Sequence, residues 1–141
     1  MVNEEFQKAA TEYELFRSQL EALAQQNELL TMSLEEHMRA KETMTRFQEG
    51  GKGSEILVPV GANSFLFAKI KEPDKAIVGI GSDLTVEEDM GRAIKRLDGK
   101  IEDLNSALKS LAEKMVEISQ KSEQKSEIVK TLYAQAQQGT E

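Results

Sequence analysis

Apolar residues recur with a seven-residue period along the first third of the chain, from Asn3 to about Gln48. No proline or glycine interrupts this stretch, and the spacing alternates between three and four residues. This alternation keeps the side chains on one stripe of an α-helix and is typical of a coiled-coil seam. The pattern therefore predicts a long amphipathic helix. Its predicted seam positions are Phe6, Tyr13, Leu20, Asn27, Leu34 and Lys41 in one column and Val2, Ala9, Phe16, Leu23, Leu30, His37 and Met44 in the other.

The same period returns in the last third of the chain, from Met90 to about Ala136, and predicts a second long helix. Two polar residues, Ser122 and Lys125, occupy seam positions near its end, and we expect them to loosen the seam there. The predicted seam positions are Met90, Leu97, Leu104, Leu111, Ile118, Lys125 and Leu132 in one column and Ile94, Ile101, Leu108, Met115, Ser122, Val129 and Ala136 in the other.

The two predicted helices are equal in length. Each has about 45 residues, which corresponds to about 65–70 Å at 1.5 Å per residue. Equal helices that flank a compact insert indicate an antiparallel coiled coil, with both chain termini at its far tip. The predicted parts are an N-terminal helix (residues 1–49), an insert (residues 50–88), and a C-terminal helix with its tail (residues 89–141).

The insert reads as short strands. Glycines at 50, 51 and 53 end the first helix, because glycine favours positive φ and weakens helix interiors. Two β-rich runs, at 55–60 and 64–70, flank the turn residues 61–63, which predicts a hairpin with a three-residue loop. A third run at 76–80 follows a proline-containing turn.

The segment after the third strand allows two interpretations. Thr85 with Glu88 three residues later resembles a helix capping box. Residues 84–86 also alternate after a hairpin-type turn, so they could complete a second hairpin, with Asp89 capping the helix instead. We prefer the second interpretation. The expected fold class is α+β, mostly α: a long antiparallel two-helix coiled coil with two β-hairpins at its base.

The predicted strands are apolar on both faces, and two hairpins of this size are marginally stable alone. Open edges and two apolar faces require coverage by another sheet, which two helices cannot supply while also extending away from it. We therefore expect the hairpins to associate with other subunits. The candidate oligomerisation residues are Ile56, Val58, Val60, Phe65, Phe67, Ile70, Ile77, Val78 and Ile80.

Composition excludes several classes of function. The net charge of −7, with no basic stripe, disfavours nucleic acid and anionic membranes as partners. The chain has no cysteine and one histidine, His37, so it lacks the residues for a catalytic triad or a thiolate metal site. The run Gly51-Lys52-Gly53 lacks the serine or threonine of a phosphate-binding loop. We expect no enzymatic activity, no metal and no cofactor.

Two further absences indicate location. No apolar run approaches the roughly 20 residues that cross a bilayer. The acidic N-terminus lacks the basic and then apolar layout of a signal peptide. The expected location is the cytoplasm.

The order helix, two hairpins, helix resembles the α subunits of the prefoldin family, and archaeal members in particular. The segments 55–67 and 76–88 resemble the first and second hairpins of that family in amino-acid sequence as well as in their place along the chain. The resemblance implies an ATP-independent holding chaperone, built as a hetero-hexamer of two α and four β subunits around a double β-barrel. It also implies that unfolded client proteins are held at the coiled-coil tips and passed to a group II chaperonin.

A holding chaperone needs apolar surface that its own fold does not fully hide. The expected tip concentrates four of the seven aromatic residues, although each of them could instead simply close the helix seam. Two other classes stay open: a coiled-coil adaptor that bridges folded partners, and, less favoured, a transcription factor that inserts a helical hairpin into a polymerase. The candidate client-binding residues are Phe6, Tyr13, Phe16, Ile128, Val129, Leu132 and Tyr133.

Overall fold

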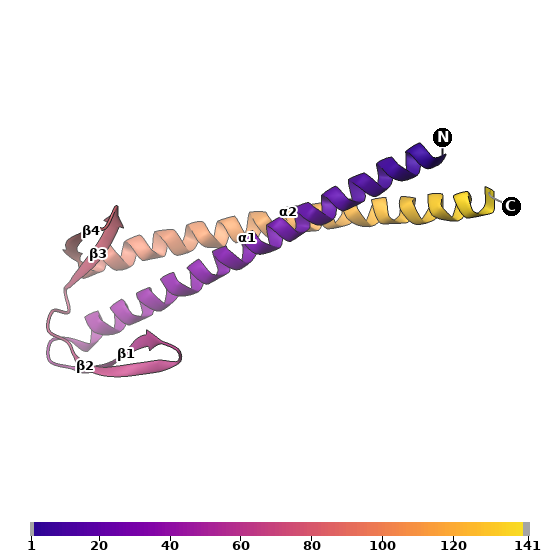
Figure 1. Ribbon diagram of the computed structural model, residues 1–141. Helices are drawn as coiled ribbons and strands as arrows, with labels where there is room; N and C mark the ends of the chain where they lie inside the picture. Colours follow the sequence, from indigo (N-terminus) through magenta and orange to yellow (C-terminus); the bar gives the residue numbers. More distant parts are fainter. Residues whose placement is uncertain (1, 140–141) are drawn as a thin grey trace. The chain divides into compact units, whose positions relative to one another are not determined.

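The computed structural model describes residues 2–139, and the side chain of Val2 lies outside the described part. Along the chain, two long helices flank two small antiparallel strand pairs (Figure 1). This arrangement confirms the predicted fold class. The elements are α1 (Val2–Gly50), β1 (Glu55–Gly61), β2 (Ser64–Lys69), β3 (Lys75–Gly81), β4 (Leu84–Asp89) and α2 (Met90–Gly139).

The chain divides into two compact units. We call residues 1–31 with 106–141 the terminal unit, because it holds both chain ends, and residues 32–105 the central unit. The terminal unit consists of the first part of α1 and the last part of α2. The central unit holds all four strands with the adjoining helix segments.

The core of the terminal unit lies in the predicted seam. Leu23, Leu111 and Ile118 are each 8% exposed and form one cluster. Their columns come from opposite helices, so the cluster confirms that the seven-residue pattern marks the contact face. Four half-buried side chains complete it: Phe16, Leu20, Leu30 and Met115.

The first hairpin pairs β1 with β2, and its turn is shorter than predicted. Gly61 pairs with Ser64, which leaves a two-residue turn of Ala62 and Asn63, both at positive φ (50° and 56°). Positive φ at both central positions matches the twist of the strands. A bulge between Pro59 and Gly61 takes up the extra residue, so the prediction of a three-residue loop was wrong by one residue.

The second hairpin repeats this design twenty residues later. Gly81 pairs with Leu84, Ser82 and Asp83 have positive φ, and a bulge again lies between Gly79 and Gly81. Strand β4 runs to Asp89, so the strand interpretation of residues 84–86 is confirmed.

Helix α2 begins directly after this strand. The carboxylate of Asp89 accepts a hydrogen bond from the backbone N–H of Arg92 at 3.3 Å, as a helix cap does. The backbone N–H of Met90 donates to the carbonyl of Asp74 at 2.7 Å. Met90 and Ala93 are buried (4% and 2% exposed), so the first turn of α2 is anchored in the central unit.

The first hairpin is tied to the end of α1. The backbone N–H of Gly53 donates to the carbonyl of Ile70 at 2.7 Å, and the N–H of Ile70 donates to Ser54 at 2.9 Å. The Ile70 side chain is 2% exposed, with its Cδ1 close to Gly50. Ile70 therefore packs within its own chain and is not available to another subunit, which corrects its place among the candidate oligomerisation residues.

Candidate functional site

Aromatic side chains from the two chain ends meet in the terminal unit. The rings of Phe6 and Tyr133 lie 6.3 Å apart, centre to centre, with 39° between their planes. The guanidinium of Arg17 lies 5.9 Å from the ring centre of Tyr13. We use the word tip for residues 3–17 of α1 and 125–139 of α2, the part of the terminal unit that carries these contacts.

The predicted tip residues differ in how much surface they offer. Tyr133 is 56% exposed and Ile128 is 43% exposed, so these two offer the most surface of the predicted set. Phe16 is half-buried against the core cluster and closes the seam. The remaining four are half-buried: Phe6, Tyr13, Val129 and Leu132.

One exposed apolar residue of the tip was missed by the sequence reasoning. Leu15 is 56% exposed. It lies outside both seam columns, and a search restricted to the seven-residue pattern does not select it. The one signal for its exposure is its position: a leucine outside the seam columns has no predicted packing partner on the other helix.

An ion pair joins the seam residue Lys125 of α2 to Glu12 of α1, which lies beside the seam columns. The ammonium of Lys125 lies 2.5 Å from the carboxylate of Glu12, and each side chain is 32% exposed. The hydrogen bond from Lys125, more than the charges of Lys125 and Lys8, lowers the pKa of the Glu12 carboxyl, although burial opposes the shift. Ser122, one turn earlier, is 7% exposed. The polar seam positions are thus packed and bridged, and the looseness expected of them stays a prediction.

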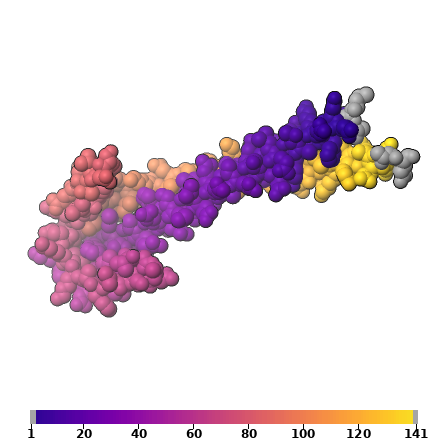
Figure 2. Space-filling view, in the orientation of Figure 1, coloured from indigo at the N-terminus to yellow at the C-terminus, as the bar shows by residue number. Residues whose placement is uncertain are grey.

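The hairpins of the central unit carry most of the exposed large apolar residues. Phe67 is 85% exposed and Ile77 is 74% exposed. Leu57 and Phe67 are cross-strand partners, so they share one face of the first hairpin. In the space-filling view both hairpins present uncovered surface (Figure 2).

Most of the candidate oligomerisation residues fall on this surface. Besides Phe67 and Ile77, the exposed ones are Val60, Phe65 and Ile80, and the half-buried ones are Ile56, Val58 and Val78. Four further exposed apolar residues of the hairpins were not selected from the sequence: Leu57, Leu66, Leu84 and Val86.

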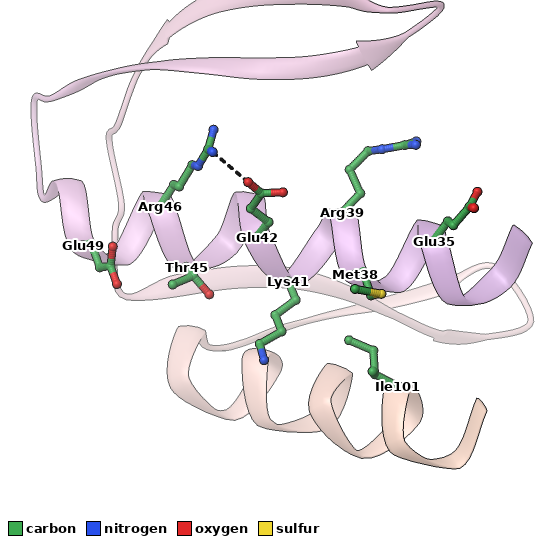
Figure 3. Close-up of a pocket in the computed structure, with 9 residues that line it drawn as sticks. All are labelled: Glu35, Met38, Arg39, Lys41, Glu42, Thr45, Arg46, Glu49 and Ile101. Atoms are coloured by element: carbon green, nitrogen blue, oxygen red, sulfur yellow. Dashed lines mark hydrogen bonds and ion pairs between the residues drawn. The ribbon is translucent and has the colours of Figure 1, made fainter. Parts of the chain in front are cut away.

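A groove of about 740 Å³ lies in the central unit between α1 and Ile101 of α2 (Figure 3). Met38 and Ile101 supply its apolar lining. The α1 side carries three acidic and three basic side chains, and two of them, Glu42 and Arg46, form an ion pair at 2.7 Å. The charged lining residues are Glu35, Arg39, Lys41, Glu42, Arg46 and Glu49.

The described residues form neither a cluster that could bind a metal ion nor a membrane-spanning helix. From residue 2 to residue 139, no three histidine, cysteine, aspartate or glutamate side chains are grouped so that they could hold a metal ion. Within the same range, neither helix has a stretch long and apolar enough to cross a membrane.

Comparison with known proteins points to one family. The family model described as prefoldin subunit matches residues 16–135. The chain is 38% identical over 102 residues to prefoldin subunit alpha of Thermococcus onnurineus, covering 72% of this chain and 69% of that protein. It is 33% identical over 120 residues to prefoldin subunit alpha of Pyrococcus horikoshii, covering 84% of this chain and 81% of that protein.

One solved structure is also similar. It is the cryo-EM structure of filamentous PFD from Methanocaldococcus jannaschii, with a TM-score of 0.48 and 24% sequence identity. The match covers 86% of this chain and 95% of that chain.

Proposed function

The chain belongs to the prefoldin family of chaperone subunits, and from that premise we propose that its tip holds unfolded client proteins while its hairpins join partner subunits. Holding of this kind uses no nucleotide and no cofactor. Clients are kept from aggregating and are then passed to a group II chaperonin in the cytoplasm.

The observation that carries the tip assignment is the exposed apolar surface at the chain ends. Tyr133, Ile128 and Leu15 are each more than 40% exposed, although all three are apolar or aromatic. Burial of one such side chain against a client is worth about 1.5–3 kcal/mol, so several weak contacts give a grip that is firm but reversible. Several subunit tips that contact one client at the same time bind it far more tightly than a single tip does.

The assembly assignment rests on the two hairpins. Each is a two-stranded sheet with both edges open and with large apolar side chains in solvent, Phe67 and Ile77 above all. Such edges and faces are normally covered by further strands. The partners that fit are prefoldin β subunits, and the proposed particle contains two copies of this chain and four β subunits.

The tip assignment can be tested in the assembled complex, where the β-subunit tips remain intact. The variant Phe6→Ser/Leu132→Ser/Tyr133→Ser removes apolar surface from the tip. A denatured reporter protein, diluted from denaturant and carrying a photo-crosslinker, should label this variant several-fold less than the wild-type chain. Native mass spectrometry should show the same subunit composition for both.

Val116→Ser is the matched control, since Val116 is an exposed apolar residue (58%) of the terminal unit outside the tip. We expect labelling of this variant to equal that of wild type. Full labelling of the triple variant would sink the tip assignment and favour a coiled-coil adaptor that bridges folded partners. Equal losses in both variants would show that clients bind along the whole terminal unit.

A further inference from the structure

The seam of the terminal unit contains three polar residues, Asn27, Ser122 and Lys125, and only Lys125 carries a charge. Between the core cluster and the aromatic pair of the tip, Lys125 forms an ion pair with Glu12 in place of apolar contact. Lys125 occupies a column that is otherwise methionine, leucine and isoleucine. Seam positions of a coiled coil are normally apolar, and residues that break such a pattern are often found at functional sites.

The pair joins the two helices rather than neighbouring turns of one helix. Glu12 lies on α1 and Lys125 on α2, and both are two-thirds buried. Three other ion pairs of the terminal unit link residues three or four apart on one helix, and their side chains are more than half exposed. Among the described residues of the terminal unit, the Glu12–Lys125 pair is therefore the ion pair that links the two helices.

We call the Glu12–Lys125 ion pair the joint. It stabilises the contact between the two helices less than apolar side chains at the same positions would. Each of the two charged side chains is 32% exposed, and replacement of a partly buried ion pair by apolar residues of similar size is often neutral or stabilising. Removal of one partner alone has the opposite effect, because it leaves the other charge without compensation. The joint therefore holds the tip closed, but less firmly than leucines would.

We propose that the Glu12–Lys125 pair is a positioning device that keeps the tip openable, so that the seam residues beyond it become available to clients. This rests on the proposed function of the tip. In the closed state Phe6, Val129 and Leu132 are half-buried and offer clients only part of their surface. Opening beyond the joint exposes them, while the core cluster holds the two helices together below it.

The test replaces the joint by apolar packing, with the variant Glu12→Leu/Lys125→Leu in the complex assembled with its partner subunits. Amide hydrogen exchange of residues 3–10 and 126–136 reports the open population of the tip. We expect it to slow by about tenfold. If only the open tip binds clients fully, the apparent client affinity falls by the same factor, about tenfold.

The matched control is Glu117→Leu/Lys121→Leu, which makes the same chemical change at an exposed pair on one helix, 3.2 Å apart. We expect neither its tip exchange nor its client labelling to decrease. A charge exchange, Glu12→Lys/Lys125→Glu, should restore both readouts to near wild-type values, whereas each single reversal should speed exchange at the tip.

The outcomes separate this inference from the proposed function. Slower amide exchange at the tip of Glu12→Leu/Lys125→Leu, together with weaker client labelling, supports the proposal that the ion pair keeps the tip openable. Slower exchange with unchanged labelling overturns it, as does unchanged exchange. In either of those cases the tip assignment still stands if Phe6→Ser/Leu132→Ser/Tyr133→Ser loses labelling, and it fails if that variant keeps full labelling.

Discussion

Single side chains of the terminal unit differ in importance according to their place in the seam. Leu111 is 8% exposed inside the core cluster, whereas Leu29, another leucine of the same unit, is 68% exposed. Deletion of a buried side chain removes its transfer free energy and leaves a cavity, while surface substitutions change little. The energetic contrast between the two leucines should therefore be large.

Leu111→Ala should destabilise the helical pair by about 2–5 kcal/mol, as is typical for buried leucines. Leu29→Ala should stay within about 0.5 kcal/mol of wild type. Thermal unfolding followed by circular dichroism of the assembled complex gives both numbers as shifts of the midpoint. Equal shifts for the two variants would contradict the assignment of the core.

The Glu12 carboxyl should make the terminal unit sensitive to acid. Its pKa in the folded chain is lowered, mainly by the hydrogen bond from Lys125, so its contribution to stability is present above the ordinary glutamate value of about 4.3. That contribution is lost as the pH falls through the lowered value. At pH 7, wild type should therefore be more stable than Glu12→Gln.

The measurement is the difference in thermal midpoint between wild type and Glu12→Gln, followed from pH 7 down to below the ordinary glutamate pKa. Because every other carboxyl is common to both chains, the difference isolates Glu12. It should shrink below pH 4.3 or so. A difference that is constant with pH, or that grows as the pH falls, would contradict the role of the ion pair.

At the level of elements, backbone conformation at the hairpin turns decides how the strands pair. Gly61 has φ +96° and Gly81 has φ +105°, beside turn residues that also have positive φ. A side chain at Gly61 would meet no atom within 4 Å, so any cost of substitution there lies in the backbone and not in a clash. This makes the first hairpin suitable for a clean test.

Gly61→Ala should destabilise the first hairpin by about 1–2 kcal/mol, because left-handed backbone is costly for residues with a Cβ. Ala62→Gly is the paired variant: Ala62 already has φ +50°, so glycine there should be neutral or stabilising. Native mass spectrometry over a dilution series should show that only Gly61→Ala lowers the fraction of assembled complex. Equal assembly of the two variants would mean that this turn does not govern association.

The sequence was sufficient for elements whose pattern is long. The seven-residue columns predicted both helices and the seam that contains Leu23, Leu111 and Ile118. It was insufficient where one residue changes the register. The bulge at Val60 shortens the turn to Ala62 and Asn63, and no local signal separates that from a three-residue loop.

Contacts between distant residues were also beyond the sequence. Lys125 was recognised as a polar seam residue, but its partner Glu12 lies outside the seam columns and more than a hundred residues away. Ile70 belonged by pattern to the strand surface, yet it is buried beside Gly50 where the chain leaves α1. Side-chain packing between separate segments decided both cases.

On the scale of the whole molecule, most of the exposed large apolar side chains of the described chain lie on its hairpins. Phe65, Phe67 and Ile77 are all more than half exposed, on sheets whose edges are open. Large apolar side chains that gather on one exposed surface mark interaction sites. The net charge of −7 favours solubility of the free chain but does not cover these side chains.

The proposed chaperone assembly can be tested by the native mass of the complex that a tagged copy of this chain recovers from its source cells. We predict a particle with two copies of this chain and four shorter helical-hairpin subunits, which gains mass when a denatured client is added. A homodimer, or a complex with one large folded partner and no gain of mass with client, would contradict the proposed assembly.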